Sequence, residues 1–280
     1  MSTQTSMRDA LYEAPGPRTR RAIAWGTAAS LVGVGVLVWL VIRRFWEHGQ
    51  FAPRYWSFFL RPTTWAFLGR GFLGTVEVAL AAGAIAFFLG LLLMLGRVGR
   101  NRVVSAVCRV LTDLFRSLPS LLLIYFFFLV IPKYGLHLPA FWMITLPVGL
   151  AASGVLAEVF RAGVNAVPRG QTEAALSLGM SEAKVMWKIV LPQALRIVIP
   201  SLISQLVVVV KDTSVAYVVS FPDLMQNARV LISNYDALVS TYFVVAVIYV
   251  LVNYGLNQLA IYVARRSGTR IISRTEEAPV

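Results

Sequence analysis

The sequence predicts an all-α integral membrane protein that forms one bundle of spanning helices. The chain is 58% hydrophobic and only 14% charged, with a mean hydropathy of +0.70, whereas soluble domains carry roughly 25% charged residues. Its apolar runs reach the roughly 20 residues that a helix needs to cross a bilayer. Because these runs are continuous and do not alternate with polar residues, they exclude a transmembrane β-barrel.

Six apolar runs account for the expected helices. In chain order they cover residues 23–42, 72–96, 118–131 with an extension back through 113–116, 141–159, 194–221 and 237–264. The first run follows a basic segment, as in a signal peptide, but it is too long for the apolar region of one and no clear cleavage site follows Ile42. We therefore expect a retained extra helix at 23–42 and a membrane domain at 71–264.

More polar segments flank and separate these runs. Residues 1–22 are expected to be disordered because they are polar and contain two prolines. Residues 43–70 interleave arginines with aromatic residues, which predicts an outside loop or a segment lying in the membrane interface. Residues 265–280 are expected to form a polar tail.

The distribution of positive charge predicts the orientation of the chain. The net charge is +13, which taken alone would also suit a nucleic-acid-binding protein. With a cytoplasmic N-terminus, 18 of the 26 Lys and Arg residues fall on the inside, 7 fall outside, and Lys211 lies within a span. This asymmetry follows the positive-inside rule. It predicts a multi-pass protein with both termini and segment 165–192 in the cytoplasm, and with lipid rather than nucleic acid around it.

Segment 165–192 is polar although it lies between two apolar runs. Pro168 can open a helix, Gly179 predicts a break, and Ser181 can cap a second helix that Pro192 closes. Two short helices of this kind would give a membrane protein a place to dock a soluble partner. A solvated connecting loop is the alternative that the local pattern leaves open.

Charged residues inside spans are costly and usually face a cavity or a partner. Glu77 is expected one turn from the outer end of the second helix, where it could also reach the outer interface. Glu158 and Arg161 are three residues apart, and so are Asp113 and Arg116, which is the spacing of a local ion pair on a helix. We interpret the pair of Glu158 and Arg161 as structural.

Lys211, Asp212, Thr213 and Ser214 are consecutive near the middle of the fifth span. They could hold a zwitterion, with its ammonium group on Asp212 and its carboxylate on Lys211. A buried Lys211–Asp212 ion pair that fixes helix packing is the alternative, and the residues alone do not decide between the two.

No catalytic or metal-binding constellation is visible, so we expect neither an enzyme nor a metal site. Cys108 is the only cysteine, and the two histidines, His48 and His137, lie in separate predicted loops. No phosphate-binding loop or dinucleotide fingerprint is present. Energy for transport against a gradient would therefore come from another chain that binds ATP, or from an ion gradient as in a secondary transporter, although the internal repeats common in secondary transporters are not visible.

The segment 157–220 resembles the permease subunits of ABC importers for polar amino acids, the group that carries histidine, glutamate, glutamine, arginine and opines. The resemblance extends over about 69–264 and further suggests a glutamate-type permease of an actinobacterium. The matching residues are Glu158, Arg161, Pro168, Gly170, Gln171, Glu173, Ala174, Ala175, Gly179, Pro192 and the run Lys211–Ser214. Ser117 and Val215 stand where the family commonly has glycine and leucine.

The resemblance implies a fold and a set of partners. The fold would be that of a type I ABC importer permease, with a five-helix core and one extra N-terminal helix. Two ATPase subunits would bind ATP and Mg²⁺ in the cytoplasm, a solute-binding protein would deliver the amino acid outside, and a second permease would complete the path. The coupling residues would be Gly170, Gln171 and Glu173 with Ala174 and Ala175 as a small close-packing surface, Gly179 as the turn, and Pro192. The substrate path would include Glu77, Lys211, Asp212, Thr213 and Ser214. The expected function is uptake of a glutamate- or glutamine-like amino acid by alternating access across the plasma (inner) membrane of a prokaryote.

Overall fold

The computed structural model describes residues 16–266, and within this range all regular structure is helical. The predicted disordered segment 1–22 and the tail 265–280 lie largely outside the described residues, but residues 17–22 are helical, which corrects the prediction of disorder there. The chain divides into two compact units, residues 1–57 and 58–280. Five helices of the described part are long and apolar enough to cross a membrane, or six if a bent pair counts as one span.

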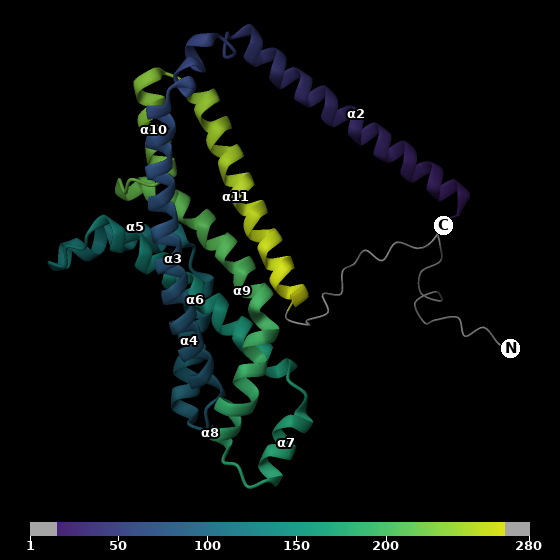
Figure 1. Ribbon diagram of the computed structural model, residues 1–280, viewed down its shortest axis with the longest axis vertical. Helices are drawn as coiled ribbons and strands as arrows, with labels where there is room; N and C mark the ends of the chain where they lie inside the picture. The colour runs from purple at the N-terminus through teal and green to yellow at the C-terminus, as the bar shows by residue number, and fades with distance from the viewer. Residues whose placement is uncertain (1–15, 267–280) are drawn as a thin grey trace. The chain divides into compact units, whose positions relative to one another are not determined.

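The first unit contains the extra helix that the sequence predicts. Helix α2 spans Pro17–Glu47, starts with a proline at its first position, and includes the whole apolar run 23–42 (Figure 1). Arg43 and Glu47 form an ion pair at 2.8 Å one turn apart near its end. A short 3₁₀ turn, η1 (Pro53–Tyr55), follows. The predicted loop 43–70 is therefore partly helical.

Two long helices form the centre of the second unit. Helix α3 (Pro62–Val98) crosses α6 (Ala140–Ala166), and their small residues let the two backbones approach closely. A Cβ atom on Gly149 would lie 2.9 Å from Ile85 Cγ2, and one on Gly90 would lie 2.9 Å from the Ser153 carbonyl oxygen. The glycines therefore set the distance between the helices.

We expect Gly149→Leu to disrupt this crossing, because the added side chain has no space against Ile85. Overpacking a filled core costs roughly 1–3 kcal/mol, so the purified protein should unfold at a lower temperature. Gly255→Leu on α11 (Leu238–Arg266) is the matched control, since nothing lies within 4 Å of a Cβ atom there. Equal unfolding temperatures for the two variants would contradict the close crossing.

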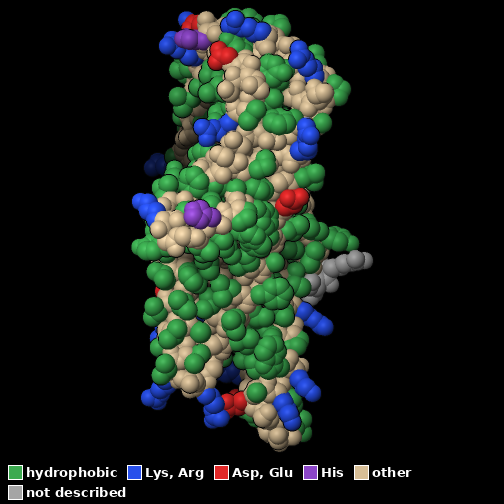
Figure 2. Space-filling view, turned by 90° about the vertical axis from the view of Figure 1, so that its left-hand side faces the viewer, with side chains coloured by type: hydrophobic (Ala, Val, Ile, Leu, Met, Phe, Trp, Pro, Cys, Tyr) green, Lys and Arg blue, Asp and Glu red, His purple; other side chains and the backbone are tan. Residues whose placement is uncertain are grey.

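The remaining long helices pack beside this pair. Helix α9 (Leu191–Thr213) continues into the 3₁₀ turn η6 (Ser214–Val219) and contacts α6, α3 and α11 (Leu238–Arg266). The short helices α7 (Arg169–Ser177) and α8 (Glu182–Val185) lie at one end of the unit, and α10 (Leu224–Tyr235) lies at the other (Figure 1). Hydrophobic side chains cover much of the surface in the middle of the view, and Lys and Arg lie mainly toward its top and bottom (Figure 2).

The predicted third span is broken, which corrects the expectation of one helix from 113 to 131. Helix α4 (Arg102–Ser117) stops before Pro119, and the chain resumes as α5 (Ser120–Tyr125), the π-helical η3 (Phe126–Val130) and the 3₁₀ turn η4 (Ile131–Tyr134). The two halves meet at 97°. Proline disfavours a helical conformation in the residue before it, and Leu118 is indeed extended.

A hydrogen-bond network attaches α10 to α3 at the end of the unit away from α7. Thr75 Oγ1 accepts a bond from the Leu224 backbone N–H at 3.1 Å, and Asn227 Nδ2 donates to the Phe67 carbonyl at 2.7 Å. The Asp223 carboxylate caps α10 by accepting from the Gln226 N–H at 2.7 Å. Burial raises the pKa of Asp223 to about 6. The polar groups thus hold this end of the bundle together.

Candidate coupling unit and substrate path

Segment 165–192 forms a two-helix structure, which we call the coupling unit. Pro168 occupies the cap position of α7, and Ser181 occupies that of α8, although its hydroxyl makes no capping hydrogen bond. Helix α8 continues through the π-helical η5 (Met186–Val190) directly into α9. The predicted helix, break and second helix are all present.

Gly179 makes the turn between the two helices. Its φ angle is +78°, a conformation that glycine adopts at little steric cost. The Met180 N–H donates to the Ala175 carbonyl at 3.2 Å, and the Gly179 N–H donates to the Leu176 carbonyl at 2.9 Å. This pair of bonds is a Schellman motif, which satisfies the last carbonyls of α7. The turn is therefore a defined structure rather than a loose loop.

Pro192 does not close the unit, which corrects the prediction. It is the second residue of α9, and the helix runs without interruption through it. In a regular helix a proline ring clashes with the carbonyl four residues earlier. The π-helical turn immediately before Pro192 widens the helix at that point, so the proline is accommodated. The coupling unit is consequently continuous with a spanning helix.

The coupling unit has a small hydrophobic core of its own. The core joins α7, η5 and the start of α9, and consists of Val167, Ala175, Val185, Val190 and Ala194. Ala175 is only 5% exposed, so it packs inward and is not part of an outer surface with Ala174, as the resemblance had implied. Adjacent helical residues point about 100° apart, which separates the two alanines.

The outer face of α7 carries most of the other predicted coupling residues. Gly170, Gln171, Glu173 and Ala174 are all exposed. No hydrogen bond or ion pair of the Glu173 side chain is present in the described part of the chain. Two large apolar residues, Leu178 at 85% and Trp187 at 55% exposure, lie on the same unit. The sequence reasoning missed them, although exposed apolar residues in a polar segment are a mark of an interaction surface.

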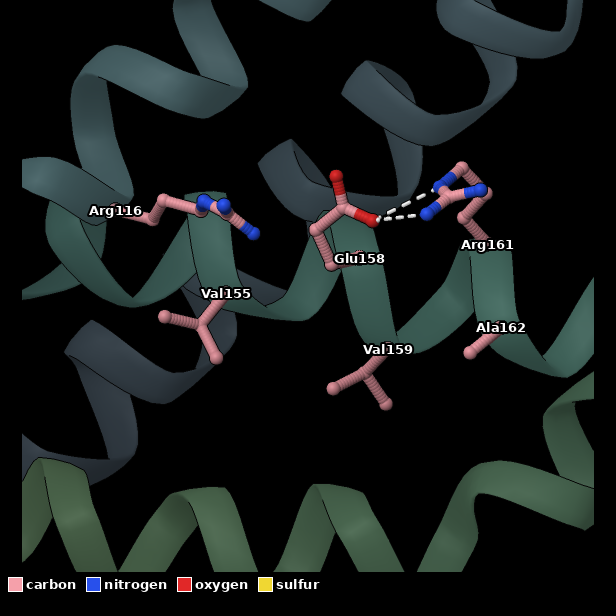
Figure 3. Close-up of a pocket in the computed structure, with 6 residues that line it drawn as sticks. All are labelled: Arg116, Val155, Glu158, Val159, Arg161 and Ala162. Carbon is pink, nitrogen blue, oxygen red and sulfur yellow. Dashed lines mark hydrogen bonds and ion pairs between the residues drawn. The ribbon is translucent and has the colours of Figure 1, made fainter.

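Glu158 joins two helices through a cluster of arginines. Its carboxylate bonds Arg161 one turn further along α6, at 2.7 and 2.8 Å (Figure 3). It also pairs with Arg97 of α3. The expected Glu158–Arg161 pair is present, and Arg97 is an addition that the sequence did not indicate. The Glu158 side chain is 19% exposed. Glu158, Arg161 and Arg116 line a pocket of about 470 Å³. Arg116 also pairs with Asp113 at 3.8 Å, as the spacing predicts.

The run Lys211–Ser214 lies where α9 gives way to η6. Lys211 is exposed and Asp212 is half-buried, and no ion pair between them is present among the described residues, so the structure does not contain the buried pair. Ser120, at the start of α5, lies close to Asp212. The two helix breaks therefore meet at this carboxylate.

The two hydroxyls beside Asp212 are directed at their own helix. Thr213 is fully buried and donates to the Val210 carbonyl at 2.8 Å, and Ser214 donates to the Lys211 carbonyl at 2.6 Å. Thr213 consequently supports the helix end in this structure and does not line an open path. Lys211 and Asp212 are the better placed members of the predicted set.

Glu77 lies in a different place from the one predicted. Helix α3 starts at Pro62, ten residues before the apolar run, so Glu77 falls well inside the helix and not one turn from its outer end. Its side chain is exposed. The polar start of α3, with Arg61, Thr63 and Thr64, concealed the additional turns in the sequence.

Known proteins identify the family of this chain. Residues 86–268 match the family described as the binding-protein-dependent transport system inner membrane component. The chain is 31% identical over 242 residues to the glutamate transport system permease protein GluD of Corynebacterium glutamicum. The matched region covers 83% of this chain and 88% of that protein. It is 36% identical over 200 residues to a probable glutamine ABC transporter permease protein of Bacillus subtilis, covering 70% and 91% respectively.

Solved structures show the same fold. A chain from the crystal structure of an amino acid ABC transporter with histidines has a TM-score of 0.68 and 27% identity, covering 72% of this chain and 94% of that one. A chain of the MetNI methionine ABC transporter has a TM-score of 0.63 at 19% identity, covering 74% and 99%. The family gives no support to the alternative of an ion-coupled carrier. The chain therefore belongs to the binding-protein-dependent transport system inner membrane component family, and it is a membrane-spanning subunit of an amino-acid ABC importer.

Proposed function

We propose that the coupling unit transmits the closure of a separate ATPase dimer to the membrane helices, and that the cargo is a glutamate- or glutamine-like amino acid. ATP and Mg²⁺ would be bound and used by the ATPase subunits. One observation carries the coupling role: the unit is a compact structure, held by its own core and a Schellman turn, that is continuous with the helix α9. A unit built in this way moves as a rigid body, whereas a flexible loop would absorb the motion.

The orientation follows from the charge distribution. The positive-inside asymmetry supports a cytoplasmic position for the coupling unit and for both termini. A solute-binding protein would then deliver the amino acid at the α10 end of the bundle. A second copy of this chain or a related permease would complete the path between two subunits.

The cargo proposal rests on two kinds of support. Relatives named for glutamate and glutamine cover most of the chain. Asp212 and Lys211 offer one negative and one positive group at the meeting of two helix breaks, a place where transporters commonly expose backbone and side chains to a substrate. These groups suit the ammonium and carboxylate that every amino acid carries, so they would serve binding, and the choice among amino acids would rest on other contacts.

Asp212→Ala is expected to weaken the apparent affinity of transport by about tenfold or more, because a charged hydrogen bond to the substrate contributes roughly 1.5–3 kcal/mol and about 1.4 kcal/mol corresponds to tenfold. Uptake of labelled glutamate and glutamine would be measured with the complete importer in vesicles. Ser204→Ala is the matched control, since Ser204 lies on the same helix, is exposed, and bonds only the Pro200 carbonyl. If Asp212→Ala transports with unchanged apparent affinity, Asp212 is a packing residue.

A further inference from the structure

A large cavity lies between the coupling unit and the ends of two spanning helices. Its volume is about 1480 Å³, and it is lined by the last turns of α3 and α6 on one side and by α7, α8 and η5 on the other. Pockets for small molecules have volumes of roughly 300–1000 Å³. The cavity therefore exceeds what one amino acid would fill, and the substrate path described above does not include it.

The walls of the cavity are mainly apolar. Leu95 and Val98 of α3, Val164 of α6, and Val185 and Met186 from the coupling unit face it. Trp187 also lines it and is 55% exposed. Tryptophan is enriched at the level of the lipid headgroups, and α3 and α6 are both candidate spans that end at the cavity. The cavity thus lies at the height where a bilayer changes from hydrocarbon to headgroup.

The polar edge of the cavity is positively charged. Arg100 and Arg169 line it together with one carboxylate, that of Glu182. Arg100 pairs with Glu182 at a long 3.4 Å, and both side chains are well exposed, at 88% and 59%. No hydrogen bond or ion pair of the Arg169 side chain is present in the described part of the chain. Arg169 is therefore available to bind an anionic group, and Arg100 is held only by a weak surface pair that such a group could replace.

We propose that this cavity binds an anionic phospholipid, with its phosphate on Arg100 and Arg169 and an acyl chain along the apolar wall. Basic pockets between spanning helices on the cytoplasmic side bind anionic headgroups in this way. Because the occupant touches α3, α6 and the coupling unit together, it would fill the space across which the unit moves. The site adds a lipid ligand to the importer and does not depend on which amino acid is carried.

Native mass spectrometry of the purified complete importer tests the proposal, with dioleoyl phosphatidylglycerol and dioleoyl phosphatidylcholine as probes. Retained phosphatidylglycerol should exceed phosphatidylcholine. Arg100→Gln and Arg169→Gln should each weaken phosphatidylglycerol binding about fivefold. An arginine near an anionic surface contributes about 1 kcal/mol to binding, and about 1.4 kcal/mol corresponds to a tenfold change in affinity. Glu182→Gln should strengthen binding, since it releases Arg100 and removes a negative charge.

Two controls distinguish this site from general charge attraction and from a soluble anion. Arg109→Gln removes an exposed arginine of α4 that does not line the cavity, and it should leave binding unchanged. Glycerol 3-phosphate, which has the headgroup chemistry without acyl chains, should not displace the lipid. Equal losses with Arg109→Gln, equal retention of phosphatidylcholine, or displacement by glycerol 3-phosphate would each overturn the proposal.

Discussion

Replacing Glu173 by lysine is expected to abolish ATP-driven uptake while the importer still inserts in the membrane. Glu173 is exposed on the outer face of α7, and its side chain has no partner in the described part of the chain. A carboxylate in this position is free to pair with a basic group of the ATPase, and charge reversal would replace that attraction with repulsion. Truncating one side of a desolvated charge pair costs roughly 2–5 kcal/mol in an interface.

The measurement is uptake of labelled glutamate into vesicles, together with co-purification of the ATPase subunit. Glu173→Gln should lose less activity than Glu173→Lys, because it removes the charge without reversing it. Glu47→Lys is the matched charge reversal in the first unit, where it breaks only the exposed pair with Arg43, and it should transport normally. Normal uptake by Glu173→Lys would exclude Glu173 from the contact with the ATPase.

Glu158→Gln is expected to destabilise the helix bundle strongly. The carboxylate bonds Arg97 of α3 and Arg161 of α6, and the Arg97 and Glu158 side chains are only 18% and 19% exposed. Removing the negative charge leaves the largely buried Arg97 without its partner and beside a second positive charge, that of Arg161, whose side chain is 40% exposed. Breaking a buried pair costs roughly 3–5 kcal/mol, and the partial exposure here reduces our expectation to about 2–4 kcal/mol.

Thermal unfolding of the purified protein measures this effect, because seven tryptophans report on the fold. Asp113→Asn is the control: it breaks the Asp113–Arg116 pair, whose side chains are about half exposed, and exposed pairs contribute at most about 1 kcal/mol. The double variant Arg97→Leu with Glu158→Leu should recover much of the lost stability, since it removes both charges at once. An unfolding temperature for Glu158→Gln equal to that of Asp113→Asn would contradict the structural role.

The sequence predicts a helix well where the length of an apolar run determines it. It predicts less well where a proline is present, because the effect of a proline depends on the backbone around it. The spans at 23–42, 72–96 and 141–159 lie within observed helices, and the span at 237–264 does so except for its first residue. Pro119 and Pro192 were misjudged in opposite directions. Pro119 breaks a span that was expected to continue, whereas Pro192 lies inside a helix that was expected to end, because a π-helical turn precedes it.

Contacts between distant residues explain what the sequence could not predict at the site. Arg97 and Glu158 are 61 residues apart, so no local spacing indicates that they meet. Ala174 and Ala175 are equivalent as residue types, and only the core of the coupling unit shows that one faces inward. The turn at Gly179, by contrast, was predictable because a glycine after a short helix is a strong local signal.

ATP-driven uptake by the reconstituted importer tests the central claim most directly. The chain would be placed in vesicles with its ATPase, any partner permease and the solute-binding protein, and labelled glutamate and glutamine would be offered outside. Uptake that requires ATP on the side of the coupling unit, and that persists after sodium and proton gradients are collapsed, is the result we expect. Uptake that ignores ATP and follows an ion gradient would contradict the account.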